Sequence, residues 1–238
     1  MDGGNSSGQD AAQRYWSKLG ELALPKDKAR RRMIADGQNT AVSVEGYDLL
    51  RTRILAATST RGWNRIGVTQ ARTGRAGPLT ALNLALSEAR RLSRRVVLVD
   101  LDIAHQPILN RLGAAGRQAE AVASDPDGAL QLPGWRLSDQ LALLTVAAAP
   151  AQAATLLLNE TFQARLASSL SRLSPDITIF HLPAMLSGDA GLASLPMVQA
   201  VLLAVDGRSD RASDLRASEA RIGEACPILG LFLLDAEV

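Results

Sequence analysis

The sequence predicts an α/β fold, doubly wound, with a mostly parallel sheet covered by helices on both faces. Two observations lead to this prediction. Short, continuously apolar runs alternate with longer helical runs, and such runs are typical of parallel strands buried on both faces. Residues 65–107 also show the order strand, glycine-bearing loop, helix and strand ending in carboxylates. That order is the layout of a nucleotide-binding βαβ unit.

Length and composition limit the number of domains and the classes of protein that this sequence can represent. The 238 residues are enough for one α/β domain, placed at 41–238, after an N-terminal extension at 1–40 whose first ten residues should be disordered. The formal net charge of +2 gives no indication of nucleic-acid binding. The single cysteine, Cys226, excludes an intrachain disulfide and fits a reducing cytoplasm. No apolar run approaches the roughly 18 residues of a membrane span, so we expect a soluble, cytoplasmic protein.

Each element has its own sequence signal. In the extension we expect a helix at 11–24 and a basic segment at 26–33, either a solvated linker, which we prefer, or a docking segment for an acidic partner or a membrane surface. Residues 113–139 are polar and should be irregular. The other predicted helices are 43–57, 79–94, 108–112, 156–173 with a break near Asn159, and 209–225. The predicted strands are 65–70, 95–100, 141–146, 176–181, 200–205 and 228–234.

The loop of the βαβ unit lacks the residues with which such a loop binds phosphate. A working phosphate-binding loop carries Gly-Lys-Ser/Thr at its helix, where this chain has Gly77, Pro78 and Leu79. Proline suits the first turn of a helix, where its missing N–H is not needed, so we favour a plain helix entry. The alternative is a new anion site that Arg72 and Arg75 form at the helix N-terminus.

From about residue 43 to residue 235 these segments resemble the bacterial tyrosine kinase (BY-kinase) family. Its members are P-loop proteins related to the ParA/MinD ATPases, and they control capsule and exopolysaccharide assembly. From Val68 onward the chain aligns without a gap on the family motif Val-Thr-Ser-x-x-x-Gly-Glu-Gly-Lys-Ser-Thr-Thr-Ala-x-Asn-Leu-Ala. Residues 96–102 are similar to its second Walker A motif, and residues 176–183 fall on its Walker B strand. The resemblance implies a P-loop NTPase-like fold of the ParA/MinD type.

The resemblance also shows which functional residues of the family are replaced in this chain. The phosphate-binding lysine falls on Gly77, the magnesium-binding serine on Pro78 and the Walker B aspartate on His181. We therefore expect that ATP and Mg²⁺ binding is lost, and that no cofactor and no catalytic residue remains. The vestigial residues would be Asp100, Asp102 and His181, and the degenerate phosphate loop would comprise Gly74, Arg75, Gly77, Pro78 and Thr80.

Two further groups of residues carry predictions about metals and subunits. No metal is expected, and the alternative is a transition-metal site formed by two carboxylates and two imidazoles, Asp100, Asp102, His105 and His181. Glu45 and Arg51 match the Glu-x-x-Arg-x-x-Arg-Thr helix with which the family makes subunit contacts, so homologous subunits are candidate partners. The middle arginine of that motif is Asp48 here, and we therefore expect a monomer or a heteromer rather than a stable ring.

The resemblance and its departures together imply a pseudokinase. It would regulate or scaffold the assembly and export of exopolysaccharide, capsule or a holdfast-type polysaccharide. Its partner would be an inner-membrane polysaccharide co-polymerase, a Wzz-like chain-length protein, through which alone it reaches the membrane. One alternative is a residual tyrosine autokinase or ATPase that uses Arg72 or Arg75 in place of the lysine. The other is a ParA/MinD-like protein that positions a different cargo.

Overall fold

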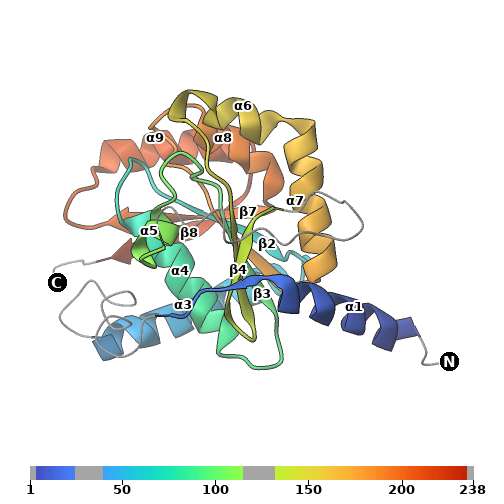
Figure 1. The fold of residues 1–238 in the computed structure, drawn as a ribbon. Helices are drawn as coiled ribbons and strands as arrows, with labels where there is room; N and C mark the ends of the chain where they lie inside the picture. The colour runs from blue at the N-terminus through green and yellow to red at the C-terminus, as the bar shows by residue number, and fades with distance from the viewer. Residues whose placement is uncertain (1–3, 25–39, 115–131, 235–238) are drawn as a thin grey trace.

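The computed structural model describes residues 4–24, 40–114 and 132–234 (Figure 1). In this part of the chain no helix has the length and apolar character needed to cross a membrane. The helices are α1 (Gly4–Lys18), α3 (Thr40–Ser59), α4 (Ala76–Ala89), α5 (Pro107–Arg111), α6 (Ala153–Leu158), α7 (Glu160–Leu173), α8 (Ala190–Ser194) and α9 (Ala212–Gly223). The strands are β1 (Gly20–Glu21), β2 (Arg65–Thr69), β3 (Val96–Asp100), β4 (Gly134–Ser138), β5 (Leu141–Thr145), β6 (Ile177–His181), β7 (Ala200–Asp206) and β8 (Ile228–Leu234).

The strands form one sheet in the order β1-β4-β5-β3-β6-β2-β7-β8. The run from β5 to β8 is parallel throughout, whereas β4 pairs antiparallel to β5 and β1 pairs parallel to β4. Helices lie on both faces of this sheet (Figure 1). The predicted doubly wound, mostly parallel α/β fold is therefore confirmed.

Two apolar cores lie on opposite faces of the sheet. In β3, Val96 and Leu98 belong to one core, with side chains of α3, α4 and α5, while Val97 and Val99 belong to the other, with side chains of α1, α7 and α9. This division explains why the central strands appear in the sequence as continuous apolar runs, since a strand covered on both faces has no solvent-exposed side. Cys226 is buried in the second core, and burial raises the pKa of its thiol.

Several elements differ from the predictions. Helix α1 begins at Gly4, so residues 4–10, which we expected to be disordered, are helical. The helix also ends at Lys18, because the chain then enters β1 and pairs with β4. We expected residues 113–139 to have no regular secondary structure, and this prediction is wrong where β4 forms. Trp135 and Leu137 of this strand are buried against the sheet. The basic segment 26–33 lies outside the described residues.

The predicted break in the helix at 156–173 is confirmed. Helix α6 ends at Leu158 and α7 begins at Glu160, and the Asn159 side chain between them accepts a hydrogen bond from the Phe162 N–H at 3.0 Å. Asparagine is a favoured helix N-cap for this reason.

Candidate functional site

The candidate site lies at the carboxyl ends of three neighbouring strands, β3, β6 and β2. In the register of the sheet, Asp100 at the end of β3 is paired with His181 at the end of β6. The loop that follows β2 then leads into α4. In open parallel sheets, ligands bind outside this edge of the strands.

A buried glutamine that sequence reasoning missed occupies the loop after β2. The Gly77 N–H donates to Gln70 Oε1 at 2.7 Å, and Gln70 Nε2 donates to the Gly74 carbonyl at 3.1 Å. One side chain therefore satisfies backbone groups on both sides of the loop. In the family alignment Gln70 falls on a serine. A long amide side chain at the start of a phosphate-type loop is the feature of the sequence that could have identified it.

The same glutamine fills the space where a lysine would begin. A Cβ atom built on Gly77 would lie 3.2 Å from Gln70 Cδ and 3.2 Å from His181 Nε2. Such contacts are tighter than ordinary van der Waals distances, so a side chain at position 77 would require both neighbours to shift. Gly77, at the family's lysine position, is therefore closely packed against its neighbours, and no cavity takes the place of the lysine side chain.

Replacing Gln70 by alanine is expected to lower the free energy of unfolding by about 1–2 kcal/mol, because the buried Gly77 N–H and the Gly74 carbonyl both lose their partner. Amide hydrogen exchange at Gly77 should accelerate, and urea unfolding should report the stability change. Gln70→Glu is the matched control: its carboxylate can still accept at the positive end of α4, so we expect a smaller loss. Equal stability of Gln70→Ala and the wild type would show that the side chain does not hold the loop.

The start of α4 agrees with the prediction that Pro78 lies in an ordinary first turn of a helix. Helix α4 begins at Ala76, so Pro78 lies in its first turn, where no intrahelical N–H donor is required. Thr80, in the next turn, is buried, and its hydroxyl has no hydrogen-bond partner among the described residues. Pro78 has no hydroxyl group, so it cannot bind magnesium as the family's serine would.

Both loop arginines form ion pairs with carboxylates of the same molecule. Arg72 contacts Asp214 of α9 through two hydrogen bonds of 2.9 and 3.0 Å, and Arg75 contacts Asp206 of β7 at 2.9 Å. The hydrogen bond from Arg72 lowers the pKa of Asp214. Burial acts to raise the pKa of Asp206, but the hydrogen bonds and positive charges of Arg75 and Arg208 together outweigh it, and the pKa is lowered. An external anion would have to compete with these two carboxylates for the arginines.

A buried histidine–carboxylate pair stands where the family has two carboxylates. His181 Nδ1 lies 2.8 Å from Asp100 Oδ1, and both side chains are almost completely buried. Asp100 also accepts hydrogen bonds from the N–H groups of Asp102, at 3.2 Å, and Ile108, at 3.1 Å. Asp100 therefore fixes the start of α5 and the turn after β3. His181 Nε2 is buried without a hydrogen-bond partner among the described residues.

The second histidine belongs to a separate pair. His105 Nδ1 lies 2.8 Å from Asp102 Oδ1, with the His105 side chain 58% exposed. The four residues of the metal alternative thus form two His–Asp pairs. Within the described residues there is no group of three or more His, Cys, Asp or Glu side chains that could hold a metal ion.

The donors at these positions do not match those that Mg·ATP requires. The Gly77 N–H is bonded to Gln70, Pro78 has neither N–H nor hydroxyl, and His181 replaces the carboxylate that would hold a magnesium-bound water. Hard cations prefer oxygen ligands, and a phosphate needs free N–H or cationic donors. Asp100 retains a carboxylate, but its oxygens already accept from His181 and two backbone N–H groups.

The two predicted subunit-contact residues have different surroundings. Glu45 is exposed on α3. Arg51 instead points toward α4, donating to Asp48 at 3.2 Å and to the Ser87 carbonyl at 2.9 Å, and Arg90 also pairs with Asp48. Burial acts to raise the pKa of Asp48, but the Ser87 hydrogen bond and the two arginines outweigh it, and the pKa is lowered. Asp48 therefore joins α3 to α4 within one molecule.

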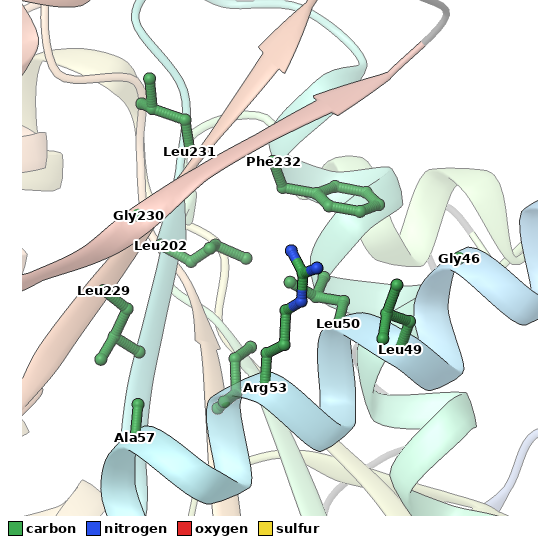
Figure 2. Close-up of a pocket in the computed structure, with 11 residues that line it drawn as sticks. Gly46, Leu49, Leu50, Arg53, Ala57, Leu202, Leu229, Gly230, Leu231 and Phe232 are labelled. Atoms are coloured by element: carbon green, nitrogen blue, oxygen red, sulfur yellow. The ribbon is translucent and has the colours of Figure 1, made fainter.

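An apolar groove of about 290 Å³ lies between α3 and β8, at the far end of the sheet from β1 (Figure 2). Sequence reasoning did not identify it. Arg53 extends from α3 into this groove, below Phe232 of β8 (Figure 2). The apolar lining includes Leu49, Leu50 and Ile54 of α3, Leu202 of β7, and Leu229, Leu231 and Phe232 of β8.

Solved structures similar to this chain include several tyrosine kinase domains. The VpsO kinase domain is 20% identical, with a TM-score of 0.65, over 81% of this chain and 94% of that one. The BceF tyrosine kinase domain is 18% identical, with a TM-score of 0.63, over 94% and 96% of the two chains. The kinase domain of the Escherichia coli tyrosine kinase ETK is 16% identical, with a TM-score of 0.67, over 91% and 89%.

A more distant similarity is to cobyrinic acid a,c-diamide synthase from Mycobacterium smegmatis, solved with an ATP analogue and magnesium. It is 21% identical, with a TM-score of 0.52, over 71% of this chain and 72% of that one. No protein-family model matches the sequence, and no curated protein matches it. The chain therefore has a BY-kinase-like P-loop fold, as the resemblance implied.

Proposed function

We propose that this chain, which has the fold of bacterial tyrosine kinase domains, is a catalytically inactive member of that group. It works through protein contacts in the assembly or export of a surface polysaccharide. Its partner, carried over from the family resemblance, is the cytoplasmic part of an inner-membrane polysaccharide co-polymerase. The protein acts at the inner face of that membrane and binds neither ATP nor Mg²⁺.

The observation that carries the proposal is the Gln70 side chain inside the loop. A phosphate group would need the Gly77 N–H, which already has a short hydrogen bond to Gln70 Oε1. Displacing this side chain would leave its amide without a partner, and no lysine is present to compensate with a charge-assisted hydrogen bond. The His181–Asp100 pair supports the same conclusion independently, because it replaces a metal-binding carboxylate by a buried imidazole.

The ion pairs of the loop argue against the residual-enzyme alternative. That alternative requires Arg72 or Arg75 to contact a nucleotide phosphate. Both are within 3 Å of carboxylates on β7 and α9, so each would have to leave its ion pair. Freeing an arginine in this way also exposes a carboxylate next to the incoming phosphate, and the like charges repel.

A complementation experiment separates a scaffold from an enzyme. In a strain that lacks the gene, an Asp102→Asn allele should restore polysaccharide yield and chain length fully. Asparagine keeps the size of the side chain but removes one of the two surviving carboxylates that a kinase would use. A Tyr15→Phe/Tyr47→Phe allele should also complement, because scaffolding needs no phosphorylated tyrosine. Loss of polysaccharide from either allele, at normal protein level, would contradict the proposal.

The partner is tested by co-purification with the co-polymerase from detergent-solubilised membranes. We expect the wild type and the Asp102→Asn variant to be recovered equally, with or without added nucleotide. Recovery that depends on ATP would indicate a nucleotide-driven positioning protein instead.

A further inference from the structure

A basic pocket lies at the opposite edge of the sheet from the candidate site. It has a volume of about 300 Å³ and lies beside the amino-terminal ends of β3 and β5, in the lower part of Figure 1. Helix α1, the turn between α4 and β3, and the hairpin of β4 and β5 form its walls. The charged residues that line this amino-edge pocket, among those described, are Arg94, Arg95, Arg136 and Asp139. Three guanidinium groups against one carboxylate favour an anionic ligand.

Arg95 is held at this pocket by neutral side chains of α1. Its Nη2 donates to Gln13 Oε1 at 2.6 Å, and its guanidinium lies over the ring of Trp16, 5.6 Å from the ring centroid. Among the described residues no carboxylate pairs with this guanidinium. Arg95 is therefore fixed in position while its charge remains available, and the planar guanidinium matches the oxygens of a phosphate.

The other two arginines of the pocket have carboxylate partners that neutralise them only in part. Arg94 shares Glu88 with Arg91, since their Nη1 atoms lie 3.7 and 3.2 Å from the same carboxylate oxygen. Arg136 pairs with Glu21, whose side chain is 75% exposed. Exposed ion pairs contribute little free energy, so a phosphate can compete with Glu21 for the guanidinium. The pocket thus keeps an excess of positive charge.

An exposed leucine lies among these arginines. The turn after α4 has the sequence Arg-Arg-Leu-Ser-Arg-Arg at residues 90–95, and its Leu92 also lines the pocket. Leu92 is 79% exposed, more than any other large apolar side chain in the described part of the chain. Cations around an exposed apolar side chain are the combination that binds an anionic lipid surface. The cations contact the phosphate headgroups, and the apolar side chain enters the boundary with the acyl chains.

We propose that this edge of the molecule binds anionic phospholipids directly, with a headgroup phosphate in the amino-edge pocket and Leu92 at the acyl boundary. The phosphate oxygens accept hydrogen bonds from Arg94, Arg95 and Arg136. This inference rests on the proposed function for the presence of a membrane, and it adds a direct contact to the one made through the co-polymerase. The candidate site, at the opposite edge of the sheet, then faces away from the membrane.

The exposed leucine favours a lipid surface over other anionic ligands. A free phosphate ester would use the arginines but would leave Leu92 in water. Single-stranded nucleic acid is bound by cations together with aromatic rings on which the bases stack. The aromatic residue at this pocket is Trp16, which is 1% exposed and therefore offers no ring face for stacking.

Co-sedimentation of the full chain with lipid vesicles tests the proposal. The wild type should bind vesicles made of equal parts phosphatidylcholine and phosphatidylglycerol, but not vesicles of phosphatidylcholine alone. Added salt should weaken the binding, because it screens the charges. Arg94→Gln and Arg136→Gln should each weaken it about fivefold, the loss expected for one arginine near an anionic surface. Leu92→Ser should weaken it on the order of tenfold, although it leaves the charge unchanged.

Matched controls make the same substitutions at exposed positions outside the pocket. Arg216→Gln on α9 and Leu158→Ser on α6, at a site that is 59% exposed, should bind the vesicles as the wild type does. Arg95 is left intact in these experiments, because its guanidinium also packs on Trp16. Circular dichroism and thermal unfolding of each variant confirm that the fold is kept.

Several results would overturn the proposal. One is a wild type that binds neither kind of vesicle, and another is full binding by Leu92→Ser or by the double variant Arg94→Gln/Arg136→Gln. A protein that ignores vesicles but binds inorganic phosphate or a DNA oligonucleotide, in a manner that depends on the arginines, would assign the pocket to a different ligand. The measurement contains neither co-polymerase nor nucleotide, so its failure would leave the proposed function standing.

Discussion

Replacing His181 by alanine should lower the free energy of unfolding by about 3 kcal/mol, because it removes the partner of a buried carboxylate. Asp100 is 0% exposed and lies 2.8 Å from the imidazole. We expect the lower end of the range for such losses, since two backbone N–H groups still bond to Asp100. In a chain of this size the melting temperature should fall by roughly 6–12 °C. Urea and thermal unfolding measure both quantities.

Two further variants show whether the pair itself is responsible. In a double-mutant cycle with Asp100→Ala, the combined loss should be smaller than the sum of the single losses by about 1–3 kcal/mol. His181→Asp restores the family's carboxylate, yet it should destabilise more than alanine does, because two carboxylates would then face each other without a metal. Additive single losses, or a stable His181→Asp protein, would contradict the assigned pair.

Trp16→Ala should lower the free energy of unfolding by about 3–5 kcal/mol, as large aromatic truncations in cores do. Trp16 is 1% exposed on α1, and its Nε1–H donates to the Leu173 carbonyl at 2.8 Å. This bond satisfies a carbonyl at the end of α7. Arg95 also lies over the indole ring, 5.6 Å from its centroid. Chemical unfolding followed by circular dichroism measures the loss.

The indole hydrogen bond and the apolar packing can be separated. Trp16→Phe should cost about 1–2 kcal/mol, because it keeps an aromatic ring but leaves a buried carbonyl unpaired. Tyr15→Phe is the neighbouring control; it removes the hydroxyl that accepts from Arg172 at 2.7 Å and should cost less than Trp16→Ala. A Trp16→Ala protein as stable as the wild type would mean that α1 is not packed into the core. In that case α1 would be free to dock elsewhere.

The sequence was a sufficient guide to the elements whose signal is local. The apolar runs predicted the central strands, because these strands are buried on both faces and show no alternation. Asn159 predicted the break between α6 and α7 through its capping preference. Strands β1 and β4 were missed, since β1 has two residues and β4 lies in a stretch with many polar residues, and both depend on pairing with neighbours.

The candidate site was predicted in its position but not in its contacts. The alignment placed Gly77, Pro78 and His181 at one edge of the sheet, and the structure brings Gly77 and His181 together there. It gave no indication that Gln70 bonds across the loop, or that Arg72 and Arg75 reach α9 and β7. The carboxylates that the two arginines contact, Asp214 and Asp206, lie far away in the sequence, and only the folded sheet brings them within hydrogen-bond distance. The groove between α3 and β8 likewise depends on two segments that are far apart in the sequence.

Isothermal titration calorimetry with Mg·ATP and Mg·ADP tests the central claim most directly. The account predicts no saturable heat for the wild type. It predicts the same for Gln70→Ala, because opening the loop does not supply the missing lysine, serine hydroxyl and carboxylate. Saturable binding with a micromolar dissociation constant, abolished by Arg75→Ala, would show that the loop still holds a nucleotide and would contradict the account.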